Sequence, residues 1–185
     1  MTLTPALSWS IANQITILRI LLAPVYIITL LYGFTAATLA IFFALGASDA
    51  VDGFVARRTG QITFLGTILD PLADKLILIA SFLSLSFLGL IPAWLTVVVV
   101  SRDVLILTGS LVLKVFSGSV AVTPSLLGKW TTGFQFLTVF WVLWFNFLET
   151  HPPLMEPLLG FTAAATLASG LHYVYQGMRR SADTP

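Results

Sequence analysis

Apolar residues dominate six long segments of the chain, and short polar or glycine-containing stretches separate them. Each segment is close to the length of about 20 residues that a helix needs to cross about 30 Å of hydrocarbon. We therefore expect six transmembrane helices, at Ile15–Tyr32, Thr35–Ala56, Phe64–Leu88, Pro92–Phe116, Trp130–Phe147 and Leu154–Tyr175. The stretch Pro5–Ala12, which holds Trp9, is expected to lie in the membrane interface before the first helix.

The composition agrees with an all-α integral membrane protein of one domain. Of the 185 residues, 57% are hydrophobic and 9% are charged, which is far more apolar than an ordinary soluble domain. No polar stretch approaches the size of an independent core, so we expect residues 1–185 to form a single transmembrane domain. The net charge of +1, with scattered basic residues, argues against a nucleic-acid partner. The chain has no cysteine, which excludes disulfides and thiolate metal sites.

The basic residues fall between alternate pairs of apolar segments. The connections near Gly33, Gly89–Ile91 and Glu149–Glu156 contain no Lys or Arg. The other connections and the C-terminal stretch hold Arg57, Arg58, Lys114, Lys129, Arg179 and Arg180. Lys and Arg are retained on the cytoplasmic side of a membrane. This pattern predicts a multi-pass protein of the plasma (inner) membrane with both termini in the cytoplasm.

Four carboxylates interrupt the apolar sequence of the second and third segments: Asp49, Asp52, Asp70 and Asp74. Their spacings are i,i+3 and i,i+4, so on helices each pair projects from one face. Measured along a helix from the intervening turn, both pairs lie at depths of about 9–16 Å. The two pairs are therefore expected to meet at one level near the cytoplasmic surface.

The cost of burying these acids indicates what compensates them. Each unpaired Asp at depth costs about 2.5–3.5 kcal/mol, and mutual repulsion adds to this. Two divalent cations would balance four carboxylates, and Mg²⁺ or Mn²⁺ prefers such all-oxygen ligands. We therefore predict two bound Mg²⁺ ions, or Mn²⁺ in their place. Such a centre also suits a phosphate-bearing substrate, because Mg²⁺ bridges carboxylate and phosphate oxygens.

Two stretches at fixed spacing carry a resemblance to a known family. They are DAVDGFVAR from Asp49 and, after eight residues, GTILDPLAD from Gly66. Together they resemble the signature of the CDP-alcohol phosphotransferases, D-x-x-D-G-x-x-A-R followed by G-x-x-x-D-x-x-x-D. Asn13, Thr16 and Arg19, leading to Pro24, look like the first helix of that family.

The resemblance implies a reaction and roles for the matching residues. It implies transfer of a phosphatidyl group from CDP-diacylglycerol to an alcohol, with release of CMP, by a homodimeric enzyme of phospholipid synthesis. Asp49, Asp52 and Asp70 would be the principal metal ligands, and Asp74 would lie near the metals as general base. The remaining signature residues would line the CDP site with Asp49, namely Gly53, Ala56, Arg57 and Gly66.

Different stretches of the sequence point to two different acceptor alcohols. The stretches LDPLADK from Leu69 and LGKWTTGFQ from Leu127 look like phosphatidylglycerophosphate synthases, whose acceptor is glycerol 3-phosphate. Arg102, Lys129 and Lys75 would hold that acceptor, its phosphate by charge-assisted hydrogen bonds. The stretch SRDVLIL from Ser101 resembles instead the eukaryotic-type cardiolipin synthases, whose acceptor is phosphatidylglycerol. We expect glycerol 3-phosphate, with phosphatidylglycerol as the alternative.

Other interpretations of these residues stay open. Aspartates at depth would also suit a divalent-cation transporter, although transporter sites usually lie near the midplane between repeats. Arg102 and Asp103 would equally form an ion pair inside the helix bundle. Lys129 would be a basic residue that extends to the membrane surface. Gly170 is expected to mark close helix packing.

Overall fold

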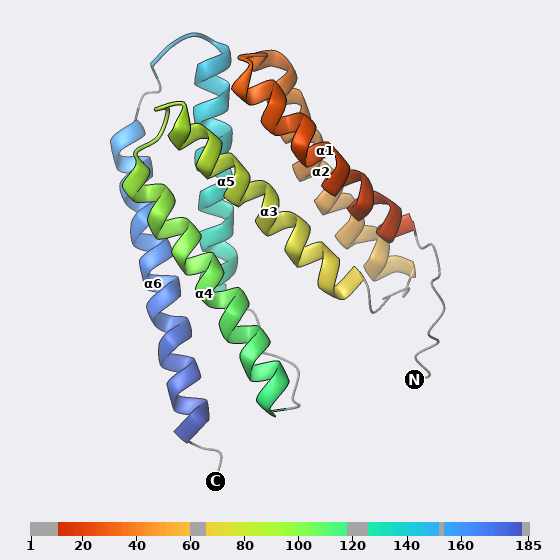
Figure 1. Ribbon diagram of the computed structural model, residues 1–185, viewed down its shortest axis with the longest axis vertical. Coiled ribbons are helices and arrows are strands. Elements are labelled where there is room, and N and C mark those ends of the chain that lie inside the picture. Colours follow the sequence, from red (N-terminus) through yellow and green to blue (C-terminus); the bar gives the residue numbers. More distant parts are fainter. Residues whose placement is uncertain (1–10, 60–65, 118–125, 152–153, 183–185) are drawn as a thin grey trace. The chain divides into compact units, whose positions relative to one another are not determined.

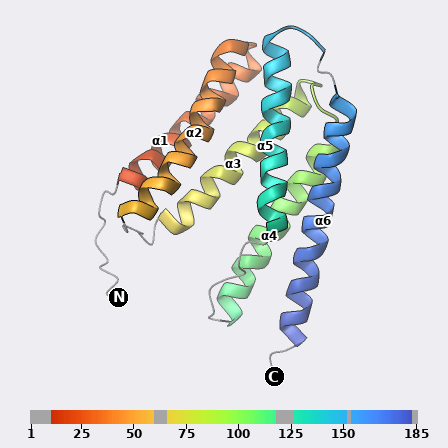
Figure 2. The same ribbon diagram turned by 180° about the vertical axis from the view of Figure 1, so that it is seen from behind.

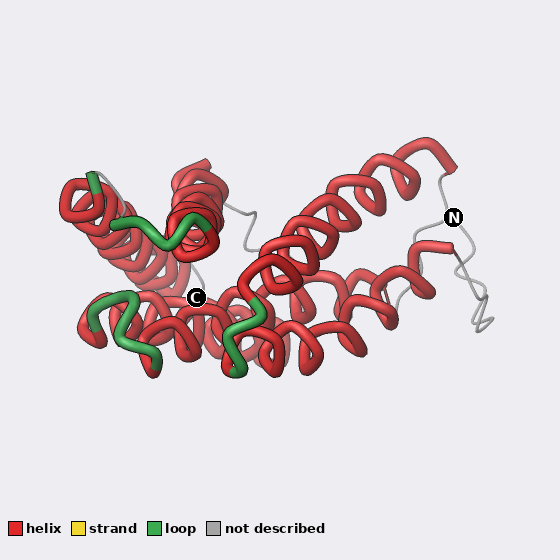
Figure 3. The backbone as a smooth tube through the Cα atoms, turned by 90° about the horizontal axis from the view of Figure 1, so that it is seen from above, coloured by secondary structure: helices red, strands yellow, loops and turns green. Residues whose placement is uncertain are grey.

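The computed structural model describes residues 11–59, 66–117, 126–151 and 154–182, with side chains described for 17–48, 75–108, 127–151 and 154–176. The described residues form six helices and no strand (Figures 1 and 3). The helices are α1 (Ile11–Leu31), α2 (Thr35–Thr59), α3 (Gly66–Phe87), α4 (Ala93–Ser117), α5 (Leu126–Phe147) and α6 (Met155–Ala182). The predicted all-helical class is confirmed, since each predicted segment coincides with most of one helix.

The structure bears on two predictions about the membrane: the six transmembrane helices and the interfacial stretch before the first of them. Searching the described residues alone finds no helix both long and apolar enough to cross a membrane. The proposed interfacial stretch Pro5–Ala12 lies outside the described residues, apart from Ile11 and Ala12 at the start of α1.

Two compact units divide the chain, one at Met1–Ala80 and the other at Ser81–Pro185, so the boundary falls inside α3. In the first unit α1 packs along α2. In the second unit α6 packs along both α5 and α4, as both side views show (Figures 1 and 2).

The first unit is held together by large side chains between α1 and α2. Tyr26 and Leu30 of α1 are buried, as are Phe42 and Leu45 of α2. The spacing of four residues on α1, and of three on α2, places each pair on one helix face. The rings of Tyr26 and Phe42 lie with their centroids 5.8 Å apart. Arg19 of α1 is also buried, at 1% exposure.

The second unit places polar groups between its helices and large apolar groups on its surface. Thr138 of α5 and Thr162 of α6 have no exposed surface, whereas Val97, Phe161 and Leu171 are 63%, 69% and 72% exposed. A protein surrounded by water usually has the opposite arrangement. Small hydroxyl-bearing residues between helices let the backbones approach closely and form hydrogen bonds across the interface.

Three helices end in the same hydrogen-bonded turn, the Schellman motif. In α1, α3 and α5 the last residues accept a pair of backbone bonds, such as Gly89 N to Ser86 O and Leu90 N to Leu85 O after α3. The motif requires a left-handed residue one position beyond the cap. Gly33 and Gly89 fill this position with φ of 75° and 72° after α1 and α3, whereas after α5 it is Glu149, with φ of 53°. Glycine adopts this conformation without the steric cost that a β-carbon brings.

We expect Glu149→Gly to raise the free energy of unfolding by about 0.5–1 kcal/mol. Relief of the left-handed strain, about 1–2 kcal/mol, exceeds the entropy that glycine adds to the unfolded chain. The matched control is Gly89→Ala, because a β-carbon there meets nothing within 4 Å and only the φ angle opposes it. Chemical unfolding should show that the control is destabilised. A destabilised Glu149→Gly protein would contradict this account of the turn.

Candidate functional site

The four aspartates of the signature lie on two helices, which correspond to the second and third predicted segments. Asp49 and Asp52 belong to α2, while Asp70 and Asp74 belong to α3. Gly66 is the first residue of α3. The other residues assigned to the CDP site, Gly53, Ala56 and Arg57, follow in α2. The side chains of all these residues lie outside the described set, so their metal and nucleotide roles stay predictions.

The remaining acids and histidines whose side chains are described do not form a metal centre. Where side chains are described, no three residues among His, Asp and Glu are grouped as metal ligands would be. The Nε2 atom of His172 lies 2.8 Å from the side-chain amide nitrogen of Gln176. The pair spans one turn of α6.

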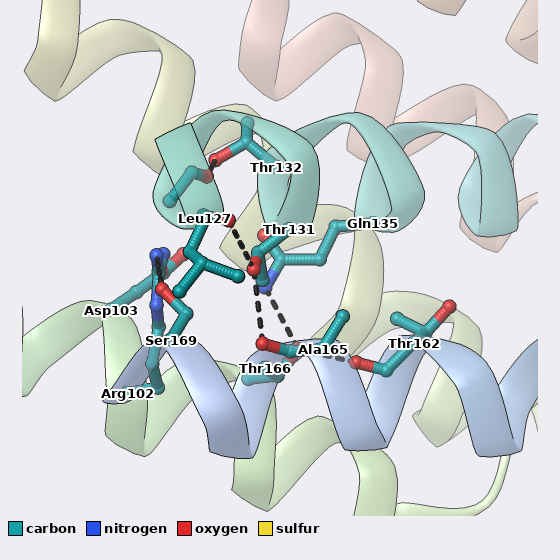
Figure 4. Close-up of polar contacts among 11 residues, drawn as sticks. Arg102, Asp103, Leu127, Thr131, Thr132, Gln135, Thr162, Ala165, Thr166 and Ser169 are labelled. Carbon is teal, nitrogen blue, oxygen red and sulfur yellow. Dashed lines mark hydrogen bonds and ion pairs between the residues drawn. The ribbon is translucent and has the colours of Figure 1, made fainter. Parts of the chain in front are cut away.

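A buried polar cluster in the second unit contains one of the residues assigned to acceptor binding. Arg102 of α4 is 7% exposed, and its neighbour Asp103 is fully buried. The guanidinium Nη1 of Arg102 donates to Asp103 Oδ1 at 2.6 Å, and Nη2 donates to Ser169 Oγ of α6 at 2.6 Å (Figure 4). The interpretation of Arg102 and Asp103 as an ion pair inside the helix bundle is therefore confirmed.

The ion pair does not use all the hydrogen-bond donors of Arg102. A guanidinium has five N–H donors in a planar fork, and a carboxylate or phosphate takes two of them side by side. The contacts with Asp103 and Ser169 use two donors. The buried Nε has no hydrogen-bond partner within the described part of the chain. An ion pair and an acceptor role are thus compatible for this residue.

The other two residues assigned to acceptor binding lie elsewhere. Lys129 is exposed near the start of α5, in the same unit as Arg102. Lys75 is half-buried on the part of α3 that belongs to the first unit. The described contacts place Arg102 inside a polar cluster, and the roles of both lysines stay predictions.

A polar seam between α5 and α6 was not anticipated from the sequence. It consists of Thr131, Gln135 and Thr138 on α5, which face Thr162, Ala165 and Thr166 on α6. Ser169 continues this row on α6 and bonds Arg102 of α4. Thr138 and Thr162 join their hydroxyls at 2.7 Å, and Thr131 donates to the Ala165 carbonyl at 3.0 Å. The Gln135 amide donates to the Thr166 hydroxyl at 3.4 Å (Figure 4). On each helix the seam side chains recur at i, i+4 and i+7, which is the pattern of one helix face.

Gly170 of α6 lies against the side chain of Arg102. A β-carbon at Gly170 would lie 3.4 Å from Cγ of Arg102, which is already van der Waals contact. The expectation that this glycine marks close packing is confirmed. Ser169 and Gly170 therefore contact the head and the stem of the same arginine.

Comparison with known proteins decides the family. The family described as CDP-alcohol phosphatidyltransferase matches residues 9–171, which include every helix at least in part. The chain belongs to this family. The resemblance drawn from the aspartate signature is thereby confirmed, and the chain is a CDP-alcohol phosphatidyltransferase by family.

Relatives in this family carry both of the expected activities in their names. Cardiolipin synthase (CMP-forming) of Homo sapiens is 32% identical over 198 residues, covering 95% of this chain and 65% of the human protein. CDP-diacylglycerol–glycerol-3-phosphate 3-phosphatidyltransferase of Bacillus subtilis is 31% identical over 182 residues, covering 89% of this chain and 93% of that protein. The chain thus spans somewhat less than two thirds of the human relative. The similar identities do not favour one acceptor over the other.

Proposed function

We propose that this protein transfers the phosphatidyl group of CDP-diacylglycerol to an alcohol and releases CMP, in phospholipid synthesis. The observation that carries the proposal is the family match over residues 9–171 together with the complete aspartate signature inside it. The match crosses the boundary between the two compact units. We therefore propose that residues 1–185 form one functional domain. Family membership also favours a transferase over the divalent-cation transporter.

Two divalent cations, Mg²⁺ or Mn²⁺, would be held by the four aspartates of α2 and α3. Their carboxylates form an all-oxygen donor set, which is the set that these ions prefer. When bound, the ions supply charge neutralisation for the pyrophosphate and for the departing CMP. We assign the cytidine nucleotide to Asp49, Gly53, Ala56, Arg57 and Gly66.

The proposed reaction is a single displacement of CMP at phosphorus, in which the chain's own residues take part. The acceptor hydroxyl oxygen attacks the β-phosphorus of CDP-diacylglycerol, its proton passes to the Asp74 carboxylate, and the bond from that phosphorus to the CMP oxygen breaks. A carboxylate close to the reacting hydroxyl is a suitable general base. Glycines at positions 53 and 66 leave room for the nucleotide to approach the backbone.

Glycerol 3-phosphate is the acceptor that we propose, with Arg102, Lys129 and Lys75 as its binding residues. Arg102 supports this role because its buried guanidinium keeps donors that no described residue uses. One observation favours the second acceptor, phosphatidylglycerol. The Asp103 carboxylate offsets part of the positive charge of Arg102, and this favours a phosphodiester with one negative charge over a phosphomonoester with two.

The surroundings that we propose are those of a plasma (inner) membrane. Large apolar side chains are exposed on α1, α4 and α6, including Leu21, Val97 and Leu171. Contact with lipid would remove the cost of exposing them to water. The basic residues of alternate connections support a topology in which both termini and the active site lie at the cytoplasmic face. A homodimer is proposed from the family resemblance.

Purified protein given CDP-diacylglycerol and Mg²⁺ should release CMP when glycerol 3-phosphate is added. Phosphatidylglycerol, inositol phosphate and serine are tested in parallel, and the acceptor that supports CMP release is identified by the lipid product. Chelation of Mg²⁺ should stop the reaction, and Mn²⁺ should restore it. Absence of CMP release with every alcohol would contradict the proposed function.

Asp70→Asn should reduce CMP release by more than about 100-fold while the protein still inserts into the membrane. Loss of a group outside the metal's ligand shell already costs about 10–100-fold, and loss of a direct ligand should cost more. The matched control is Glu156→Gln, which removes an exposed carboxylate from the first turn of α6. Turnover in Asp70→Asn equal to that of the control would remove Asp70 from the metal site.

A further inference from the structure

We propose that Ser169 and Gly170 of α6 are positioning residues that set the direction of the Arg102 guanidinium and thereby the affinity for the acceptor. The proposal rests on the proposed function, in which Arg102 binds the acceptor. Its basis is that two adjacent residues of α6 contact both ends of one side chain of α4. Ser169 Oγ accepts a hydrogen bond from Nη2 at 2.6 Å, and Gly170 lies against the Arg102 stem, where a β-carbon would be 3.4 Å from Cγ.

The two contacts of the guanidinium fix its plane. Asp103 Oδ1 takes one terminal nitrogen and Ser169 Oγ takes the other, each at 2.6 Å. A guanidinium and a carboxylate favour a paired, two-bond contact when nothing prevents it. By taking Nη2, Ser169 keeps that nitrogen from turning toward Asp103. The remaining N–H groups, Nε among them, then keep a defined direction.

The unpartnered Nε indicates that this orientation serves a ligand. Arg102 is 7% exposed, and its Nε is buried with no hydrogen-bond partner among the residues described. Leaving a buried donor unsatisfied is costly, and such groups in native structures usually have a functional or solvent partner. An acceptor phosphate would satisfy Nε and a neighbouring terminal N–H with two parallel bonds.

The polar seam holds α6 in a fixed position, so that Ser169 can orient Arg102. The hydrogen bond between the Thr138 and Thr162 hydroxyls, and the bond from Gln135 to Thr166, fix the register of α6 against α5. Ser169 follows Thr166 by three residues on the same face of α6 (Figure 4). A shift of α6 along its axis would therefore move the serine hydroxyl away from the guanidinium.

Ser169→Ala should raise KM for the acceptor about tenfold, the value expected for one hydrogen bond to a charged group. KM for CDP-diacylglycerol should stay within about twofold of wild type, because the hydroxyl acts only through Arg102. Ser169→Thr keeps a hydroxyl and should restore most of the acceptor affinity. The matched control is Thr38→Val, which removes a buried hydroxyl of the first unit that bonds the Phe34 carbonyl one turn earlier and has no described contact with Arg102.

A double-mutant cycle distinguishes positioning from a general loss of structure. In an Arg102→Ala background, Ser169→Ala should have no further effect on KM for the acceptor, because the residue through which it acts is gone. A graded series at Gly170 adds a second test. Gly170→Ala should be tolerated, since its β-carbon would sit at van der Waals distance, whereas Gly170→Val should displace the arginine stem and raise the acceptor KM.

The outcomes separate this proposal from the proposed function. CMP release by the wild-type protein, with acceptor KM unchanged in Ser169→Ala, would overturn the positioning role alone. Equal rises in both KM values, or an additive loss in the Arg102→Ala background, would assign Ser169 a structural role and also overturn it. No CMP release from wild type with any alcohol would overturn both.

Discussion

The second unit of this protein is organised around a buried guanidinium that is shared between a carboxylate and a hydroxyl. Burying two charges costs several kcal/mol per ion, which mutual attraction repays only when the geometry is good and further hydrogen bonds are made. Arg102 and Asp103 meet these conditions with contacts of 2.6 Å and a third partner, Ser169, from α6. The cluster ties α4 to α6, and the seam of threonines ties α6 to α5. The packing of three helices therefore depends on satisfying polar groups as well as on burying apolar ones.

This arrangement has a direct relation to the proposed chemistry. A phosphate-bearing acceptor needs a cation held in place before it arrives, because orienting the cation afterwards would cost binding free energy. A buried, hydrogen-bonded arginine meets this need better than a surface lysine with freely rotating donors. In the proposed function, the aspartates of α2 and α3 act on the donor nucleotide, while Arg102 acts on the acceptor.

Most of the fold was accessible from the sequence, because runs of apolar residues with Gly33, Gly89 and Glu149 between them mark helices and their ends. The aspartate signature was also accessible, since charged groups stand out in an apolar segment and their spacing is fixed. The turn after α5 was located from the sequence, but its left-handed Glu149 was not, because nothing local distinguishes that glutamate from one in an ordinary turn.

The polar seam and the contacts of Arg102 were harder to predict from the sequence, for a physical reason. Threonine and serine are common in apolar helices as single residues that bond their own backbone, as Thr138 and Thr162 also do. Their repeat at i, i+4 and i+7 indicates a shared face but not the partner helix. That Ser169, and not another hydroxyl, meets Arg102 depends on the register of α6 against α4, which only the packed structure supplies.

The most direct test of the central claim is to replace the pair Arg102 and Asp103 together by Met and Leu, and to measure stability and CMP release. An apolar replacement of a buried ion pair is often neutral or stabilising by about 1–4 kcal/mol. We expect a folded protein that has lost most of its acceptor-dependent CMP release. Wild-type turnover in this double variant would show that the pair serves only packing, and would contradict the account.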